Sequence, residues 1–497
     1  MTITTDTIGT PDEGAPLLGT EEAQAAATSR SQKLTVMIAA STLILAMDFG
    51  FYLTAAPQMQ IFEDIVCRNY LAALGKQADI TIAKDTCKSE PVQSELALVN
   101  GWKETSDVLP GILLSVPYGV LADHWGRKPV LLLGILGTLL GEIWVRVVCL
   151  YPAVLPLRLV WLSGMWRLIG GGDITVSSIA LVMVADRFPE EEIATALFRL
   201  TSAVILSEVL ATPVSAYLMA RNLWLPFMLG LGIAILGSWS AFMMPESLND
   251  ARSKVSSTTM PGENEVRSYP AERDAVKQYI KGKVRDLHDS TQFIMSSPDV
   301  AVCLFVLFIT SISKQSTSLL LQYTSKRFQW SIENSSLLIS LRGIITLANF
   351  LLLMPALSAL GARYLHLPGK LKDLRLAQGG SFISALGFFV MATAPSRAIL
   401  ILGIVLISLG AAFAVTCRSF VTSLVRPDQV GTLYSAAAAL TSFGMVVSGP
   451  LLAYAFRSGL HLGPTWFGLP FLIVGGVYLL GSVSLIRLRV PDRLRAQ

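Results

Sequence analysis

Long apolar segments recur along this chain and are joined by polar links. The first, Leu34–Leu53, is followed by Val108–Ala122 and Val130–Leu150. A helix of about 20 residues crosses the roughly 30 Å hydrocarbon core of a bilayer, so each long run is a candidate span. The remaining runs are Leu157–Ala185, Ala194–Met219, Trp224–Met244, Val300–Tyr323, Ser335–Leu357, Ala377–Ala394, Ile399–Val421, Gly431–Phe456 and Phe467–Ile486. The pattern therefore predicts an all-α membrane protein with twelve transmembrane helices.

The polar segments divide the chain into two halves. Residues 1–33 lack apolar periodicity, which predicts a disordered cytoplasmic tail. Residues 34–247 and 299–487 are expected to form two six-helix bundles, joined by the polar, basic linker 248–298, and residues 488–497 form a second cytoplasmic tail. Two equal sets of helices predict two pseudo-repeats. The Lys and Arg residues of the linker and of the C-terminal tail place both termini in the cytoplasm.

Composition supports a membrane protein and argues against several other classes. Of the 497 residues, 52% are hydrophobic and 15% are charged, compared with about 25% charged in ordinary soluble domains. No segment combines a basic patch with interleaved aromatic residues, so no nucleic-acid partner is expected. The chain has no G-x-x-x-x-G-K-[ST] loop, no metal-ligand spacing and only four His. An enzyme, an ATP-driven pump and a metal site are therefore not expected.

Two cysteines fall in the long link Pro57–Leu98, on the side opposite the termini. A disulfide between Cys67 and Cys87 is favoured over two free thiols, because that side is oxidising and they are the one pair in that link. The other cysteines are expected to be buried as small apolar residues: Cys149, Cys303 and Cys417.

The link between the second and third runs carries the most distinctive motif, Gly119–Val130. It reads G-V-L-A-D-H-W-G-R-K-P-V. So short a link between two spans requires an antiparallel helix pair, and its basic residues place it on the cytoplasmic side.

This motif resembles the G-x-L-a-D-r-x-G-R-k-x-x-l signature found between the second and third helices of the major facilitator superfamily. The matching residues are Gly119, Leu121, Asp123, Gly126, Arg127 and Lys128. The resemblance implies an inner gate, in which Asp123 lies near the N-terminus of the helix starting about Gly431 and Arg127 pairs with Asp186. The copy that the family carries in the second half is degraded here, at Gly361–Gln378.

Ionisable residues inside membrane spans are costly, so each is a candidate for proton coupling or for the substrate cavity. They are Asp48, Asp107, Glu142, Arg146, Arg167, Asp173, Glu208, Lys314, Arg342 and Arg418. Asp107 and Arg418 lie near expected helix ends, which makes them weaker candidates. Glu142 and Arg146 are four residues apart and are interpreted first as a structural pair. Lys314 has no acid within a turn, so it needs one from another helix or a water-filled cavity.

Three consecutive glycines separate Arg167 from Asp173 in the fourth run. Glycines let membrane helices approach closely, and the stretch resembles the superfamily's R-x-x-q-G-x-g pattern, which is associated with proton transfer. Arg167 and Gly171 match, whereas Asp173 replaces a small residue. Asp173 is expected to pair with Arg167 or with Lys314, in a pair whose protonation changes during transport. An ion pair that only locks the bundle is the structural alternative.

Prolines predict flexible points in two helices. Pro213 lies in the fifth run and Gly449-Pro450 in the eleventh, and a proline inside a helix frees a carbonyl and permits a bend. Drug/proton antiporters of the superfamily carry g-x-x-x-G-P-x-x-G-G in the fifth helix. Here only the proline is kept, so this motif does not support the antiporter assignment.

Two short patterns support weaker predictions. Glu13, Leu17 and Leu18 resemble an acidic dileucine sorting signal, although two leucines in a tail explain them equally well. Asn334-Ser335-Ser336 is an N-glycosylation sequon, but it lies so near the eighth run that we expect it to remain unmodified.

The resemblance covers Leu34–Ile486. The long link with Cys67 and Cys87, the Pro-Glu-Ser end of the first half at Pro245–Ser247 and the start of the last helix at Trp466–Phe471 look like fungal members of the superfamily. The same features resemble the proton-coupled folate and tetracycline-exporter groups.

The resemblance implies a secondary active transporter, functional as a monomer in the lipid bilayer, that moves a small organic substrate by alternating access. It implies no cofactor, because a proton gradient supplies the energy. Efflux of a metabolite or toxin is the first expectation, and uptake and a non-transporting sensor are the alternatives. The plasma membrane is favoured over the vacuolar membrane.

Overall fold

The computed structural model describes residues 15–75, 86–188, 190–247, 298–364, 369–425 and 430–488. Within these ranges the regular structure is helical, as predicted. Backbone groups in hydrocarbon must be satisfied internally, and a helix does this within one segment. Eleven helices are long and apolar enough to cross a membrane, and α3 (Glu90–Trp125), bent by 53° between Ser115 and Pro117, makes a twelfth. The predicted all-α membrane fold is therefore confirmed.

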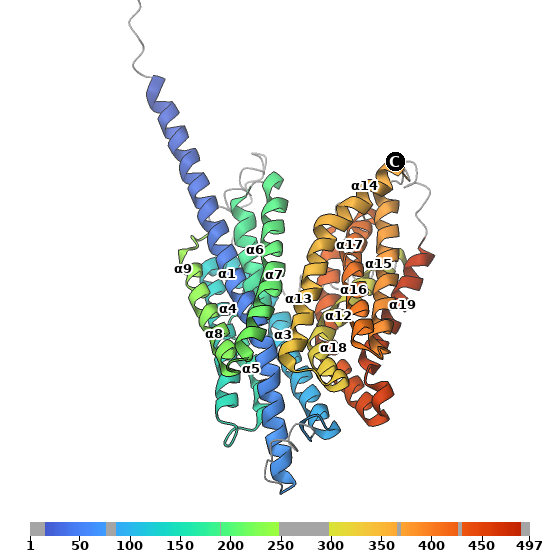
Figure 1. Cartoon of the computed structure of the whole chain (residues 1–497). Coiled ribbons are helices and arrows are strands. Elements are labelled where there is room, and N and C mark those ends of the chain that lie inside the picture. The colour runs from blue at the N-terminus through green and yellow to red at the C-terminus, as the bar shows by residue number, and fades with distance from the viewer. Residues whose placement is uncertain are drawn as a thin grey trace, which may run out of the picture.

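The helices form two groups (Figure 1). The first half comprises α1 (Ala15–Ala73), α3, α4 (Arg127–Leu150), η1 (Leu157–Leu162), α5 (Ser163–Arg167), α6 (Gly172–Arg187), α7 (Glu190–Met219), α8 (Trp224–Ser238) and α9 (Ser240–Met243). The second half comprises α12 (Pro298–Phe328), α13 (Ile332–Ala348), the π-helical η2 (Asn349–Leu353), α14 (Met354–Tyr364), α15 (Gly369–Ala392), α16 (Arg397–Gly410), α17 (Phe413–Leu424), α18 (Val430–Leu462), η4 (Pro464–Trp466) and α19 (Leu469–Arg487).

The two halves meet along two helix pairs, α3 with α18 and α7 with α13. We call the end of the molecule near the start of α1 the terminal end, and the opposite end, near Cys67 and Cys87, the loop end. Toward the terminal end, α6 and α7 diverge from α14 and α17 (Figure 1). At the loop end one apolar core crosses between the halves, because Leu321 and Ile332 join a cluster built mainly from the first half. The halves are therefore packed together at the loop end.

Small residues allow α3 and α18 to approach closely. A Cβ on Gly101 would lie 2.7 Å from the carbonyl oxygen of Gly449, and one on Gly449 would lie 2.6 Å from that of Gly101. Thr105 Oγ1, one turn along α3, donates a hydrogen bond of 3.2 Å to the Val446 carbonyl. Gly449, predicted from sequence as part of a bend, is thus a contact point between the halves.

The first helix is longer than predicted at both ends. It begins at Ala15 and ends at Ala73, so the expected disordered tail is helical from Ala15, and the expected span Leu34–Leu53 is only its central part. Glu, Gln and Ala dominate the stretch Glu21–Ala27, and these residues have high helix propensity.

The fourth span is broken, which the sequence analysis did not predict. α5 ends at Arg167 and α6 begins at Gly172. Gly170, Gly171 and Gly172 all have positive φ, at 78°, 78° and 64°, a backbone region that other residues rarely adopt. The break lies against α4, where a Cβ on Gly137 would overlap the Ile169 carbonyl oxygen. The glycines therefore interrupt the helix as well as permitting close packing.

The disulfide prediction is confirmed. Cys67 near the end of α1 is bonded to Cys87, with 5.0 Å between their Cα atoms. The three remaining cysteines are free and buried, as expected: Cys149, Cys303 and Cys417.

Replacing Gly137 with alanine should destabilise the fold. The new methyl group would collide with backbone carbonyls of the broken span, which cannot move as a flexible side chain can, and overpacking of this kind costs about 1–3 kcal/mol. Thermal unfolding of purified protein in detergent micelles measures the effect. Gly232→Ala in α8 is the matched control, because its added Cβ meets no atom within 4 Å. An equal Tm for both variants would contradict the packing argument.

Candidate functional site

The signature residues gather at the terminal end, around the start of α4. The Arg127 guanidinium forms an ion pair with Asp186 near the end of α6, as the resemblance implied. Ser247 Oγ donates a 2.8 Å hydrogen bond to the same Asp186 carboxylate. Asp123 lies 3.6 Å from Arg127 with its side chain 67% exposed. The arrangement ties α4, α6 and the end of the first half together.

Glu246 completes this cluster and is not among the functional residues predicted from the sequence. Its carboxylate accepts hydrogen bonds from the backbone N–H groups of Arg127, at 2.9 Å, and of Lys128, at 3.0 Å. A carboxylate at a helix N-terminus satisfies unpaired donors and complements the helix dipole. Gly126 leaves room for it, since a Cβ there would lie 2.7 Å from Glu246 Oε2. Glu246 therefore caps the N-terminus of α4.

Part of the predicted gate stays a prediction. Gly119 lies in α3 with open space around the position of a Cβ. The side chains of α18 up to Thr432 lie outside the described residues, as does the predicted contact of Asp123 with the helix start near Gly431.

A buried ion-pair network links four helices of the first half, α3, α4, α5 and α6. Arg167 at the end of α5 is its centre and is 5% exposed. Its guanidinium pairs with Glu142 at 3.0 Å, with Asp107 at 3.4 Å, and with Asp173. Asp173 therefore pairs with Arg167, and the alternative pairing with Lys314 is not formed.

Two further cations balance the acids of this network. Arg146 pairs with Glu142 at 2.8 Å and also donates to the Phe227 carbonyl at 2.9 Å. Lys103 pairs with Asp107 at 2.7 Å. Glu142 thus serves two arginines, so it belongs to a larger network than the isolated structural pair that its spacing indicated. Three cations meet three carboxylates, which limits the cost of burying charge.

The position of Asp107 corrects the sequence interpretation. It was expected to be near a wet helix end, but α3 begins at Glu90, so Asp107 lies in mid-helix with its side chain 11% exposed. Lys103 and Glu104 were missed for the same reason. Their charges lower the local hydropathy, so the apolar run begins only at Val108 although the helix begins far earlier. Glu104 borders a small pocket between α3, α12 and α18.

Asp48 in α1 has no hydrogen-bond or ion-pair partner among the described residues. Its side chain is partly buried, and it lies close enough to Asp173 for the two carboxylates to interact electrostatically. The Asp173 side chain is 53% exposed despite its bond to Arg167. Asp173 is therefore the accessible edge of the network, with Asp48 as a nearby second carboxylate.

A second ion pair crosses between the halves. Arg342 of α13 pairs with Glu208 of α7 at 2.9 Å and also donates to Thr317 Oγ1 of α12. Tyr52 of α1 donates to the other Glu208 oxygen at 3.4 Å. One turn further along α7, Thr212 and Ser340 share a hydrogen bond across the same interface. Neither Glu208 nor Arg342 had an assigned partner from sequence.

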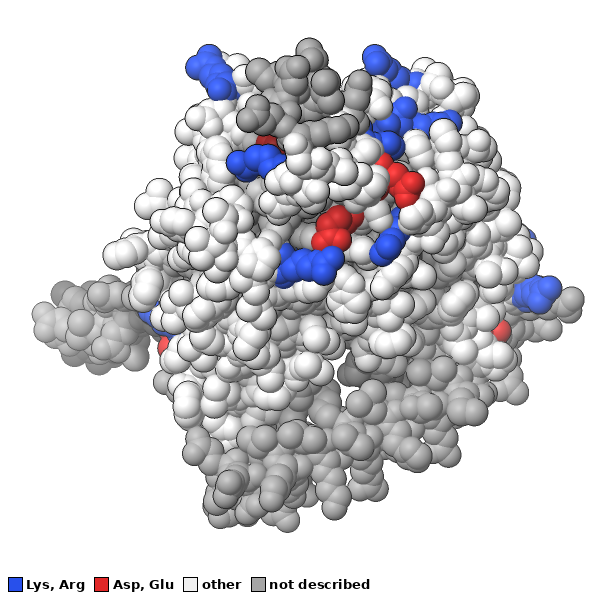
Figure 2. All heavy atoms as spheres, turned by 90° about the horizontal axis from the view of Figure 1, so that it is seen from below, with Lys and Arg blue, Asp and Glu red and all other residues white. Residues whose placement is uncertain are grey.

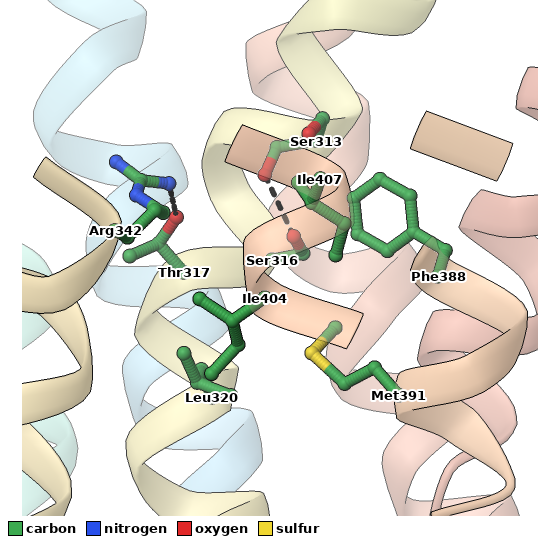
Figure 3. Close-up of a pocket in the computed structure, with 9 residues that line it drawn as sticks. All are labelled: Ser313, Ser316, Thr317, Leu320, Arg342, Phe388, Met391, Ile404 and Ile407. Atoms are coloured by element: carbon green, nitrogen blue, oxygen red, sulfur yellow. Dashed lines mark hydrogen bonds between the residues drawn. The ribbon is translucent and has the colours of Figure 1, made fainter. Parts of the chain in front are cut away.

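Arg342 also lines a pocket inside the second half (Figure 3). The close-up shows Arg342 and Thr317 on one side and Phe388 and Met391 on the other. The lining residues come from α12, α13, α15 and α16: Ser313, Ser316, Thr317, Leu320, Arg342, Phe388, Met391, Ile404 and Ile407. The pocket is therefore mainly apolar with a polar edge, as small-molecule sites usually are.

Lys314 lies on α12 beside this pocket, and its side chain is exposed. Within the described part of the chain it has no acidic partner, and its neighbouring charges are Arg342 and Arg418. No described helix supplies the carboxylate that was one of the two expectations for Lys314. The other expectation, a position that faces open space, fits its exposed side chain. Arg418 is exposed on α17.

Polar contacts close the loop end, where Figure 2 shows acidic and basic side chains gathered near the centre of that face. Lys88, next to the disulfide, pairs with Glu63 at 2.5 Å and donates to Ser325 of the second half at 2.6 Å. Gln322 of α12 donates to the Gln93 carbonyl of α3 at 2.6 Å. The disulfide therefore holds Lys88 at the junction of the halves.

The remaining sequence-predicted sites lie away from these clusters. Pro213 and Pro450 are inside the continuous helices α7 and α18. Asn334 is exposed in the first turn of α13, where its backbone N–H donates to Ser331 Oγ. Glu13 lies outside the described residues, and Leu17 and Leu18 lie in α1 with undescribed side chains.

Comparisons with known proteins place the chain among membrane transporters. The family model described as Major Facilitator Superfamily matches residues 38–449. The chain is 35% identical over 461 residues to the MFS-type transporter avaK of Aspergillus versicolor, which covers 92% of this chain and 93% of that protein. It is 32% identical over 474 residues to the MFS efflux pump atnC of Emericella nidulans, and the match covers 94% of this chain and 90% of that protein. The solved structure of a D-xylose–proton symporter shares the fold, with a TM-score of 0.59 and 15% sequence identity. The match covers 92% of this chain and 98% of the symporter.

Removing the centre of the ion-pair network should unfold the first half. Arg167→Met leaves three carboxylates with two cations, and an uncompensated buried charge costs about 3–5 kcal/mol. We expect a large loss of folded, monodisperse protein and a lower Tm in detergent. Arg158→Met is the control, because its pair with Glu95 is exposed and such pairs are worth about 0–1 kcal/mol. Equal stability of the two variants would show that Arg167 is not the centre of the network.

Proposed function

This chain belongs to the major facilitator superfamily, and we propose that it exports a small organic molecule by alternating access, driven by protons that enter the cell. The observation that carries the proposal is the uneven closure of the halves. Apolar and polar contacts join them at the loop end, while α6 and α7 diverge from α14 and α17 at the terminal end (Figure 1). We infer from this arrangement that substrate reaches a central site from the terminal end.

We assign the terminal end to the cytoplasm. The basic residues of the α3–α4 link, Arg127 and Lys128, lie there, and positive charge marks the cytoplasmic side. Substrate then enters from the cytoplasm in the state seen here. The efflux pump named among the relatives favours the same direction. The plasma membrane is our preferred location, since export there removes the substrate from the cell.

We propose that Asp48 and Asp173 carry the proton. A carboxylate at this depth needs a cation or a proton as its counter-charge. Asp173 has Arg167 for this purpose, but Asp48 has no cation within ion-pair distance among the described residues, and the two carboxylates repel each other. Protonating one of them relieves that repulsion. The exposed edge of Asp173 gives the proton a way in and out, while the buried part of the network stays ionised.

Alternation between the two states requires the contacts at the loop end to break and those at the terminal end to form. Hydrogen bonds around Lys88, Gln93 and Thr212 are individually modest, at about 0.5–1.5 kcal/mol net. Contacts of this size can be exchanged in each cycle. The first half, whose helices are tied by Arg127 and Arg167, moves as a body relative to the second half.

Neutralising the proton site should uncouple transport. In sealed vesicles containing the purified chain, substrate-dependent proton movement followed with a pH-sensitive dye should fall by more than about tenfold in Asp48→Asn, equivalent to about 1.4 kcal/mol. Downhill substrate movement should continue, because the path between the halves is unchanged. Asp173→Asn should have the same effect in a weaker form. The sign of the proton movement distinguishes export from import.

Glu95→Gln is the control, because its carboxylate lies at the loop end and pairs with the exposed Arg158. Unchanged proton movement in both aspartate variants would reject the proton assignment. Substrate binding without any flux in the folded wild-type chain would reject the transporter and favour a sensor.

A further inference from the structure

The pocket of Figure 3 combines one strong cationic group with an apolar wall. Arg342 uses one terminal nitrogen for Thr317 and the other for Glu208. A guanidinium has five N–H donors, so this one retains donors for a further acceptor. Its side chain is 29% exposed, whereas that of Glu208 is 10% exposed. The arginine is therefore the accessible partner of the pair.

The opposite wall of the pocket is apolar and rigid. Phe388 and Met391 of α15 and Ile404 of α16 are each at most 3% exposed, and they belong to the main core of the second half. Such a wall binds an aromatic or aliphatic body through burial of its surface. It offers no acceptor for a ligand ammonium group.

The two halves differ in how their cations are paired with carboxylates, and this difference indicates the charge of the ligand. In the first half, three cations meet three carboxylates around Arg167. Around the pocket, Lys314 and Arg342 lie near each other. Within the described part of the chain, the acid that forms an ion pair here is Glu208, and it binds Arg342. Lys314 has no acid within ion-pair distance there. An unpaired cation at membrane depth is costly unless an anion joins it, and the first half shows that the fold supplies such anions where the charge is structural.

From this geometry we infer that the transported molecule is an organic anion with an apolar body, whose carboxylate binds Arg342 in competition with Glu208. This inference rests on the proposed function and names its substrate class. The carboxylate would use the free face of Arg342, assisted by Lys314, while the apolar body lies against Phe388, Met391 and Ile404. Planar guanidinium–carboxylate pairing is strong and directional.

Competition for Arg342 links binding to the interface between the halves. Glu208 belongs to α7 of the first half and Arg342 to α13 of the second. A substrate that takes Arg342 from Glu208 weakens one of the bonds that hold the halves together at this level. The substrate thereby lowers the barrier to the rearrangement that carries it across.

Binding of matched compounds tests the inference. The full chain in lipid nanodiscs is exposed to benzoate, phenylbutyrate and octanoate, each compared with its neutral methyl ester and with the amine of equal chain length. Ligand-induced thermal stabilisation gives the affinities. We expect at least one carboxylate to bind about tenfold or more tightly than its ester and its amine. Equal or tighter binding of the esters or amines throughout the series would overturn the inference.

Variants separate the role of Arg342 from general folding effects. Arg342→Gln should abolish the preference for the carboxylate and leave binding of the ester, and Lys314→Gln should reduce that preference. Glu208→Gln should act in the opposite direction and tighten carboxylate binding, because it removes the competitor. Arg342→Lys keeps the charge and should retain part of the preference. Arg221→Gln, an exposed cation beside Tyr217 at the loop end, is the matched control and should change nothing.

The gain of affinity expected for Glu208→Gln cannot come from misfolding. Loss of carboxylate affinity in this variant, with an unchanged Tm in the absence of ligand, would contradict the competition between the substrate and Glu208. Flux measurements keep the two proposals apart. A chain that moves neutral or cationic compounds with no carboxylate preference disproves the anion inference and supports the transporter. A chain that binds carboxylates at Arg342 without moving any compound supports the anion site and disproves the transporter.

Discussion

Burial of charge in a membrane is the constraint on which this structure depends. A lone ion in hydrocarbon is so costly that each one must be paired, neutralised by a proton or placed beside water. Arg167 meets this requirement by joining three carboxylates from three different helices. The network therefore fixes how α3, α4 and the broken fourth span pack. The small residues between them, such as Gly137, set how closely the helices approach, and the ion pairs set which faces meet.

The two halves use charge differently, and this divides their tasks. The first half balances the buried charges around Arg167 internally, and this network has its accessible edge at Asp173. The second half leaves Lys314 without an acid among the described residues and shares Arg342 with Glu208 across the interface. An ion pair whose partner can be exchanged suits the interface between the halves, because the halves must move relative to each other there. Under our two proposals, proton handling in the first half and substrate handling in the second are separated in space yet connected through α1 and α7.

The sequence predicted the fold class well, because apolar run length directly reflects the thickness of the bilayer. It also predicted the bond between Cys67 and Cys87, and it named most members of the charged clusters. What it could not supply was the pairing between the halves. Glu208 and Arg342 are 134 residues apart, and no local pattern relates them. Hydropathy also misplaced the start of α3, since Lys103 and Asp107 reduce it although each neutralises the other in the folded chain.

The break at Gly170–Gly172 shows why such errors concentrate at the site. Averaged over a window, Leu157–Arg187 is apolar enough to read as one uninterrupted helix. The run of positive φ angles depends on contacts with α4 that lie far away in sequence. With the helix interrupted there, Asp173 falls in the first turn of α6, where a carboxylate complements the helix dipole and still reaches Arg167. A continuous helix would give Asp173 no such N-terminal position. The glycines interrupt the helix, and in this way they place Asp173 at the accessible edge of the network.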